Sequence, residues 1–324
     1  MKLLSVARVL SSSTSCSSAM LGGSGRMVAM PKSSRSLLAG PQRSMSGPAA
    51  GGASFDGEMS KIYKVIAENH RHPSGPWVTM LEQVHAFADT LPSSQREFTV
   101  LDLATGPGEP AETIARQFPH ATVVATDLSP DQVALAQETT LTLPHMTAQV
   151  ADMENLHQFE DASFDLVTCC YGFMFPPNIP QAIRESHRVL KPGGKLIATT
   201  WNRIRMMQKV TEIMQQVMGT KDIPKPPINP LSLSEPGLFE GMLMEAGYTN
   251  LEVTSHNYPF DLTADPELQF KAATMTIKAK IDELDAWDKV KEVYEANKLK
   301  HGEYTDHGHY ILPDNEYKLV VATK

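Results

Sequence analysis

The stretch FTVLDLATGPGEPA, residues 98–111, passes from an apolar run through a glycine turn into a helix-forming segment. Its first six residues have the length and apolarity of a buried strand. Gly106 and Gly108 let the backbone turn tightly and approach a ligand, and the helix expected from about Pro110 to Gln117 offers unpaired N–H groups to an anionic group. The stretch therefore predicts a strand–turn–helix unit that binds a nucleotide-like molecule.

Strands and helices alternate along the chain on both sides of this unit. Residues 129–132, Ser-Pro-Asp-Gln, predict a helix start, with a serine N-cap, proline at the first helical position and glutamine three residues after the cap. We expect further strands at 121–127, 146–150, 164–169, 195–200, 251–258 and 316–323. We expect further helices at 59–68, 78–91, 179–190, 234–247 and within 266–298. The alternation predicts an α/β fold, a doubly wound and mostly parallel sheet with helices on both faces.

The first 55 residues differ in composition from the rest of the chain. They contain six basic residues, fourteen serines and no acidic residue. Such a start is typical of an organelle transit peptide, and a short basic amphipathic helix at residues 2–10 favours a mitochondrial location over the plastid alternative. We therefore expect a leader at 1–55 and one domain at 56–324, with helical additions at 56–95 and 203–310.

Composition and charge exclude several classes of protein. The chain has 324 residues, of which 41% are hydrophobic and 20% charged, as in ordinary globular proteins. It has no run of about 18 apolar residues, so no integral membrane segment is expected. Its 3 cysteines offer neither a disulfide framework nor a zinc finger. Residues 56–324 carry 23 basic and 37 acidic side chains, a formal charge of -14, which argues against a nucleic-acid partner.

Acidic residues follow the next two predicted strands. Asp127 ends the second strand, 21 residues past Gly106, where a carboxylate can accept two hydrogen bonds from a ribose diol. Asp152 follows the third strand and could accept from an adenine amino group while Met153 packs on the ring. These residues predict a cofactor that contains a nucleoside.

Two cofactors compete for this site. Gly106-x-Gly108-x-x-Ala111 satisfies the loose dinucleotide pattern of NAD-dependent oxidoreductases. Asp102, four residues before Gly106, would repel a pyrophosphate but would attract the ammonium group of S-adenosylmethionine, which carries no phosphate. We therefore expect S-adenosylmethionine, with a nicotinamide enzyme as the alternative.

Residues 98–201 resemble the core of class I S-adenosylmethionine-dependent methyltransferases, close to the ubiquinone/menaquinone C-methyltransferase-like (methyltransferase type 11) group. The resembling segments are, in order, residues 100–111, 125–130, 151–153, 163–167, 171–175 and 188–194. The resemblance implies a seven-stranded, Rossmann-like sheet whose last strand is antiparallel.

The pattern and the resemblance together assign a set of residues to the cofactor. The resemblance implies that the glycines line the methionine moiety, that Asp127 holds the ribose, and that backbone near the end of the fourth strand completes the pocket. Ala104 stands where the family often has glycine, which is tolerable if this residue is not at positive φ. The cofactor-binding residues expected are Asp102, Gly106, Gly108, Asp127, Leu128, Asp152, Met153 and Cys169.

Methyl transfer from a sulfonium is an in-line displacement, so the protein's main task is to align the acceptor and exclude water. We expect activity of class EC 2.1.1.- on a small-molecule or lipid-like acceptor. A thiol, thioether, hydroxyl or amine acceptor requires no catalytic acid–base pair, whereas a ring carbon of a quinone precursor needs a base. Both acceptor classes stay open. A cofactor-binding assembly factor is the alternative from another functional class.

Candidate acceptor residues come from segments expected over the carboxyl ends of the strands. Tyr171 is the first choice for lining the acceptor pocket, and His70 and His72 are candidates for the base. Tyr63 and Trp201 are further candidates, and for each of these residues simple packing or a solvated loop is the competing interpretation.

Other features have a structural interpretation beside a functional one. The apolar stripe within 206–218 predicts either a lid over a hydrophobic acceptor or a helix packed on the domain. His301, His307 and His309 lack the acidic spacing of a metal site, so no metal is expected. The neighbouring Cys169 and Cys170 are expected to be core residues.

The sequence after Tyr171 also bears on the acceptor. Residues 175–178, Phe-Pro-Pro-Asn, lack the residues with which base-modifying enzymes hold a flipped base, which again argues against nucleic acid. The sequence gives no oligomeric state.

Overall fold

The computed structural model describes residues 67–92, 97–223, 229–263, 270–271, 274 and 277–324. These residues belong to one compact unit, Pro48–Lys324. The leader expected at 1–55, Tyr63 and most of the helix expected at 59–68 lie outside the described residues. They therefore stay predictions.

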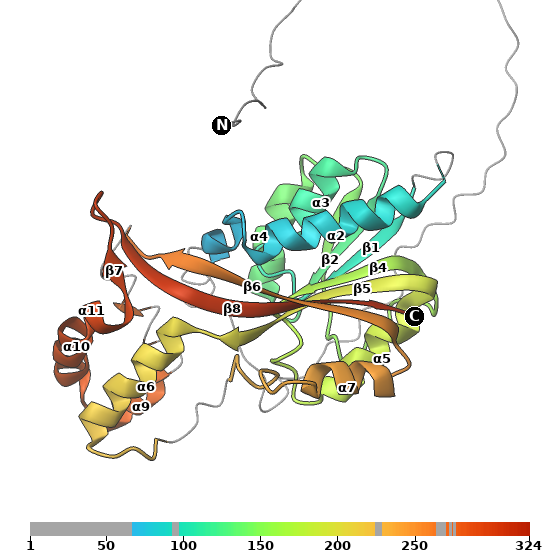
Figure 1. Cartoon of the computed structure of the whole chain (residues 1–324). Coiled ribbons are helices and arrows are strands. Elements are labelled where there is room, and N and C mark those ends of the chain that lie inside the picture. The colour runs from blue at the N-terminus through green and yellow to red at the C-terminus, as the bar shows by residue number, and fades with distance from the viewer. Residues whose placement is uncertain (1–66, 93–96, 224–228, 264–269, 272–273, 275–276) are drawn as a thin grey trace, which may run out of the picture. The chain divides into compact units, whose positions relative to one another are not determined.

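The described strands form one mixed sheet in the order β3-β2-β1-β4-β5-β8-β6 (Figure 1). The first five strands of this order run parallel, and β8 is antiparallel to both of its neighbours, β5 and β6. This confirms the predicted α/β fold with a mostly parallel sheet and an antiparallel last strand. The strands are β1 (Thr99–Leu103), β2 (Thr122–Asp127), β3 (Met146–Val150), β4 (Phe164–Cys170), β5 (Leu190–Arg203), β6 (Thr249–Asp261), β7 (Glu303–Tyr304) and β8 (Tyr310–Thr323).

One strand was not expected from the sequence. The two-residue strand β7 pairs with β8 beside the seven-stranded path, and raises the described sheet to eight strands. A strand of two residues is too short to leave an alternation of apolar and polar residues in the sequence.

Helices cover both faces of the sheet. Figure 1 shows α2, α3 and α4 on one side and α5 and α7 on the other. The described helices are η1 (Glu68–Arg71), α2 (Pro76–Thr90), α3 (Ala111–Gln117), α4 (Pro130–Thr140), α5 (Ile179–Val189), α6 (Arg205–Met218), α7 (Leu238–Glu245), α9 (Lys278–Leu284), α10 (Trp287–Ala296) and α11 (Lys298–His301).

The predicted start of α4 is confirmed in detail. The Ser129 hydroxyl accepts a hydrogen bond from the N–H of Gln132 (3.3 Å), and Pro130 occupies the first helical turn. The predicted start of β5 is wrong by five residues. Leu190 already pairs with Phe164, and the Lys-Pro-Gly-Gly stretch that follows forms an irregularity within the strand instead of preceding it.

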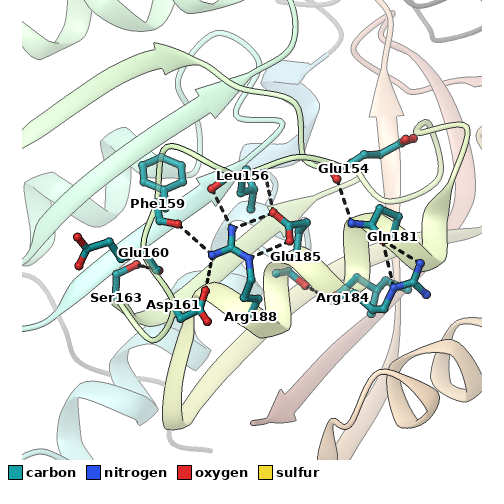
Figure 2. Close-up of polar contacts among 12 residues, drawn as sticks. Glu154, Leu156, Phe159, Glu160, Asp161, Ser163, Gln181, Arg184, Glu185 and Arg188 are labelled. Carbon is teal, nitrogen blue, oxygen red and sulfur yellow. Dashed lines mark hydrogen bonds and ion pairs between the residues drawn. The ribbon is translucent and has the colours of Figure 1, made fainter. Parts of the chain in front are cut away.

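Arg188, in the last turn of α5, fixes the loop that joins β3 to β4 (Figure 2). Its guanidinium donates to the carbonyl oxygens of Leu156 (2.9 Å) and Phe159 (3.0 Å) and forms ion pairs with Asp161 and Glu185. The carboxylate of Glu185 also accepts from the N–H of Leu156 (2.7 Å). The loop therefore has a defined path from the end of β3, where two of the expected cofactor residues lie.

The strands β6 and β8, of 13 and 14 residues, extend beyond the parallel part of the sheet to α6, α10, α11 and β7 (Figure 1). Helix α6 packs on α10 and β8 through Met206, Val210, Ile213 and Met214, which are buried. The apolar stripe of 206–218 thus packs against the fold. No described helix is both long and apolar enough to cross a membrane.

Candidate functional site

The glycine turn after β1 is held against the end of β2. Gly106 and Gly108 have φ values of 56° and 114°, in the region that favours glycine. The N–H of Gly106 donates to Oδ2 of Asp127 (2.9 Å), and the N–H of Ser129 donates to Oδ1 (2.9 Å). A carboxylate can accept about four hydrogen bonds, so the oriented Asp127 can also accept from a ribose diol.

Asp102 lies in β1 directly before this turn and is completely buried. Its Oδ1 accepts a hydrogen bond from the hydroxyl of Thr168 on β4 (2.5 Å). Its Oδ2 is buried and has no hydrogen-bond partner in the described part of the chain. Burial raises the pKa of Asp102 to about 7. A buried carboxylate oxygen without a donor is stabilised by a cationic N–H group, which is the chemistry of an ammonium ligand.

The loop after β3 lies beside Asp127. The N–H of Ala151 donates to the carbonyl oxygen of Asp127 (3.0 Å), and Oδ1 of Asp152 accepts from the N–H of Glu154 (2.9 Å). Met153 is half-buried against the core, whereas the Leu128 side chain is 53% exposed. Leu128 and Met153 thus give this edge of the sheet apolar surface that a purine ring could cover.

Gly172, just after β4, brings the ends of β1 and β4 together. A methyl group at residue 172 would lie 2.6 Å from Sγ of Cys169, 2.7 Å from Cβ of Ala104 and 3.3 Å from Cε of Met153. Three of the residues discussed for the cofactor site therefore meet at one glycine. Cys169 is buried and burial raises the pKa of its thiol, as in a core residue.

An alanine at residue 104 was expected to be tolerated if its φ is not positive, but the φ of Ala104 is positive. Its φ is 52°, in the left-handed region, where a Cβ costs about 1–2 kcal/mol. The backbone here has the conformation for which glycine is suited, and the Ala104 methyl group fills the space beside Gly172. A strained residue next to the glycine turn is typical of a functional loop.

Tyr171 follows β4 and lies in a stack of three aromatic rings, Tyr171, Trp201 and Tyr258, which we call the aromatic stack. The Tyr171 and Trp201 rings are parallel with centroids 4.0 Å apart, and Tyr258 lies 5.9 Å from Trp201 at an angle of 18°. Tyr171 has a φ of 57°, a second strained residue at this edge of the sheet. The stack stands at the ends of β4 and β5, next to Gly172.

The two candidate histidines both come from the segment around η1. His70 is buried, and its Nδ1 lies 2.8 Å from the hydroxyl of Tyr258, which in turn lies 3.4 Å from the hydroxyl of Tyr171. Burial lowers the pKa of His70 to about 3. His72 is half-buried, and its Nδ1 accepts from the N–H of Ser74 (3.1 Å). His70 therefore joins the aromatic stack, whereas His72 caps a turn at its edge.

Arg71 connects the same segment to the glycine turn. Its guanidinium donates to Oε1 of the buried Glu109 (2.8 Å) and lies 4.8 Å from the ring centre of Trp77. The carboxylate of Glu109 also accepts from the N–H and the hydroxyl of Thr113. Burial raises the pKa of Glu109, and the Arg71 charge opposes that shift. The pair fixes η1 beside the residues expected to hold the cofactor.

Sequence reasoning missed Tyr258, Tyr317, Arg71 and Glu109. The register of the sheet places Trp201 opposite Tyr317, and Tyr317 opposite His256, so that residues from three strands share one face. Tyr258 and Tyr317 are single tyrosines within the two predicted strands 251–258 and 316–323, and a sequence does not reveal which strands become neighbours.

The remaining candidates do not join this site. His301 and His309 form separate hydrogen bonds with Glu212 (3.1 Å) and Asp261 (2.8 Å), and His307 is exposed. Within the described ranges, no three His, Cys, Asp or Glu side chains are grouped so that they could hold a metal ion.

These residues fit S-adenosylmethionine. Asp102 supplies an unpaired buried carboxylate oxygen for the ammonium, Asp127 an oriented carboxylate for the ribose, and the two positive-φ glycines a close backbone approach. Leu128 and Met153 supply apolar surface for the purine. Acidic and apolar groups of this kind do not suit a pyrophosphate.

Comparison with known proteins gives consistent results. Residues 100–194 match a family model described as a methyltransferase domain. The chain is 37% identical over 122 residues to the ubiquinone/menaquinone biosynthesis C-methyltransferase UbiE of Bartonella tribocorum. This alignment covers 36% of this chain and 45% of that protein. It is 36% identical over 100 residues to the demethylmenaquinone methyltransferase of Chlorobaculum tepidum, and this alignment covers 31% of this chain and 39% of that protein. The match therefore spans less than half the length of these relatives.

Solved structures extend the likeness of fold beyond the matched segment. The YcgJ protein of Bacillus subtilis aligns with a TM-score of 0.51 and 19% sequence identity, over 76% of this chain and 98% of that one. At this identity the likeness concerns the fold alone.

Proposed function

We propose that the chain transfers a methyl group from S-adenosylmethionine to a ring carbon of a hydroxylated, quinone-type aromatic acceptor. The match of residues 100–194 to a methyltransferase domain and the similarity to UbiE-type methyltransferases support this proposal. The observation that carries the proposal is the position of the aromatic stack. It lies one residue from Gly172, at the edge of the sheet where Asp102 and Asp127 face the glycine turn.

The acceptor side is apolar and aromatic. Tyr171, Trp201 and Tyr258 are buried, and the edges of His70 and Phe260 pack against the stack. Parallel aromatic faces favour a flat ring ligand over a flexible aliphatic one, because stacking contributes about 0.5–1.5 kcal/mol beyond the burial of area. The two relatives named for quinone substrates support an acceptor of this class.

The chain's own residues mainly position the reactants. When bound, S-adenosylmethionine supplies an electrophilic methyl group on a sulfonium. Asp127 binds the ribose of the cofactor, and Asp102 binds its ammonium group. The aromatic stack orients the acceptor and excludes water. Arg71 and Glu109 hold η1 over this arrangement, so the segment that covers the acceptor is tied to the turn that binds the cofactor.

A methyl-transfer assay tests the proposal. Protein is supplied with methyl-labelled S-adenosylmethionine and a set of acceptors: a demethylated quinol, simple phenols, and small thiols, amines and alcohols. We expect the highest kcat/KM with the quinol and a product in which the label is bound to ring carbon. Asp127→Ala should lose this activity, whereas Tyr248→Phe, which removes a buried hydroxyl bonded to Ser186, should keep it.

Two outcomes would overturn the proposal. A higher kcat/KM for methylation of sulfur, oxygen or nitrogen would reassign the acceptor. Binding of the cofactor without transfer to any acceptor would favour an assembly factor.

We also propose that the protein acts in mitochondria. The acid-free, basic and serine-rich residues 1–55 support this address, with the plastid as the alternative. A fluorescent fusion to residues 1–55 should be imported into mitochondria, and a cytosolic or plastid signal would contradict the proposal.

A further inference from the structure

We propose that Tyr171, Tyr258 and His70 form a hydrogen-bonded chain that removes the ring proton displaced by methylation. This inference rests on the proposed function, because only a carbon acceptor must lose such a proton. We assign the catalytic role to Tyr171, because it directly precedes Gly172 at the end of β4, where the residues expected to hold the cofactor meet. Tyr258 and His70 act through it as positioning residues.

We assign the chain a direction that starts from a neutral His70. The hydroxyl of Tyr171 lies 3.4 Å from that of Tyr258, and the hydroxyl of Tyr258 lies 2.8 Å from Nδ1 of His70. Burial keeps His70 neutral at ordinary pH by lowering its pKa to about 3. A neutral imidazole has one acceptor nitrogen, and Nδ1 in that role accepts the proton of Tyr258, which leaves the Tyr258 oxygen able to accept from Tyr171.

Three chain segments meet in this arrangement. Tyr171 follows β4, Tyr258 is in β6, and His70 is in η1, which Arg71 fixes by its ion pair with Glu109. Tyr171 has a φ of 57°, a conformation that a tyrosine rarely adopts. The strained backbone places the Tyr171 ring on Trp201 with its hydroxyl toward Tyr258, as expected where strain serves a function.

The proton balance can be written in full. As the new bond to the ring carbon would form, the ring would supply its electron pair and become cationic, while the sulfur–methyl bond of the donor would break and leave its electron pair on the neutral thioether. The ring C–H bond then breaks, and its electron pair restores the aromatic system. The proton passes to Oη of Tyr171, the Tyr171 proton passes to Oη of Tyr258, and the Tyr258 proton passes to Nδ1 of His70, which becomes an imidazolium.

A weak base is sufficient for this step. The cationic ring has lost its aromaticity and is a far stronger acid than an imidazolium, so even a buried histidine can accept its proton. The site also gains no charge, because the single positive charge moves from the methyl donor to the ring and then to His70. Burial of His70 therefore does not prevent the transfer.

Substitutions separate a proton path from a structural role. Tyr258→Phe keeps the ring and removes the hydroxyl, and His70→Asn keeps a hydrogen-bonding group near Nδ1 that cannot act as a base. We expect each to lower the single-turnover rate with the quinol by about 100-fold or more, with little change in KM. Tyr248→Phe, which removes a buried hydroxyl outside the chain, should stay within about twofold of the parent.

Isotopes give a readout that a structural role would not change. In the parent protein, deuterium on the ring carbon should leave the single-turnover rate unchanged, because proton removal is fast. In Tyr258→Phe and His70→Asn, proton removal should become rate-limiting, so a primary isotope effect should appear.

A second readout needs no cofactor. In protein with nitrogen-15-labelled histidine, the Nδ1 resonance of His70 should show an unprotonated acceptor and should move in Tyr258→Phe but not in Tyr248→Phe.

The outcomes distinguish this inference from the proposed function. If the parent binds the cofactor but methylates no ring carbon, the proposed function fails. If the parent methylates the ring and both variants keep its rate, or lose rate without the isotope effect, the proton chain is wrong. A protonated Nδ1 in the parent would also overturn it.

Discussion

The hydroxyl of Thr168 donates a hydrogen bond to Oδ1 of Asp102 at 2.5 Å, which leaves Oδ2 as a buried oxygen without a donor in the described part of the chain. The two residues lie opposite each other on the neighbouring strands β1 and β4. Asp102 is therefore oriented by one strand partner and keeps its second oxygen for a ligand. One carboxylate oxygen of Asp102 is thus bonded inside the sheet, and the other is left for the cofactor site.

Asp102 should make the stability of the ligand-free protein depend on pH. Its pKa is raised from 3.8 to about 7 in the folded state, so the unfolded chain loses the proton first as the pH rises. The stability that Asp102 contributes is present below about pH 4 and is lost as the pH rises to about 7. Relative to Asp102→Asn, the parent should lose free energy of unfolding across this window.

Urea denaturation of both proteins at half-unit steps of pH measures this difference. A constant difference between pH 4 and 7 would contradict the account. An added adenosyl ligand with an ammonium group should favour the ionised carboxylate, so its affinity for the parent should rise with pH over the same range and stay flatter for Asp102→Asn.

Gly172→Ala should disturb the cofactor site directly. The new methyl group would come within 2.6–2.7 Å of Cys169 and Ala104, two contacts that the packed strand ends cannot relieve without moving. We expect a loss of about 1–3 kcal/mol in stability and weaker binding of S-adenosylhomocysteine. Gly241→Ala is the matched control, because its methyl group meets nothing within 4 Å and lies in α7. Equal affinities for the two variants would speak against this placement of the cofactor.

Lys209 in α6 is buried, with Nζ 3.5 Å from the ring centre of Tyr294 and 3.3 Å from the hydroxyl of Tyr310. Burial lowers its pKa from 10.5 to about 7, and the nearby Lys298 charge adds to this shift. Between about pH 7 and 10.5 the unfolded chain binds the proton and the folded chain does not, so stability should rise with pH in the parent.

Lys209→Met should therefore be more stable than the parent at pH 7, by about 1–3 kcal/mol, and should lack that pH dependence. Lys289→Met, in an exposed pair with Glu292, is the control and should change stability by less than about 0.5 kcal/mol. Chemical denaturation between pH 7 and 10 measures the free energy of unfolding of the parent and both variants. A Lys209→Met variant less stable than the parent at pH 7 would refute the expectation.

Much of the cofactor side could be predicted because its signals are local. The strand, the glycine turn, the N-cap at Ser129 and the acid at the end of β2 lie within about 30 residues, and sequence spacing fixes their relation in a parallel strand–helix unit. The structure places Asp102, Gly106 and Asp127 together as expected. The left-handed φ of Ala104 could not be foreseen, because composition does not report a single backbone angle.

The acceptor side depends on contacts between distant parts of the chain. Tyr258 lies 188 residues from His70 and 87 from Tyr171, and only the register of β6 on β8 and of β8 on β5 brings them together. Tyr171 and His70 were identified as candidates, but their connection through Tyr258 was not, since a sequence does not show which strands pair.

Arg71→Met should weaken the connection between η1 and the glycine turn. It removes a charge-assisted bond to the buried Glu109 and leaves that carboxylate, within the described residues, with its bonds to Thr113. We expect a loss of about 1–3 kcal/mol in stability and a higher KM for the acceptor. Arg116→Met breaks an exposed pair with Glu112 and should cost less than about 0.5 kcal/mol. Urea denaturation and steady-state kinetics measure both, and equal effects of the two substitutions would show that the Arg71 pair has no special role.

The most direct test of the central claim is the thermal stability of the protein with S-adenosylmethionine, S-adenosylhomocysteine and NAD, each added separately to the parent and to Asp127→Ala. At about 100 times its dissociation constant a ligand adds about 2.7 kcal/mol, a shift of several degrees for a domain of this size. We expect a shift with the two adenosyl compounds only, and its loss in Asp127→Ala. A shift with NAD alone, or an undiminished adenosyl shift in Asp127→Ala, would contradict it.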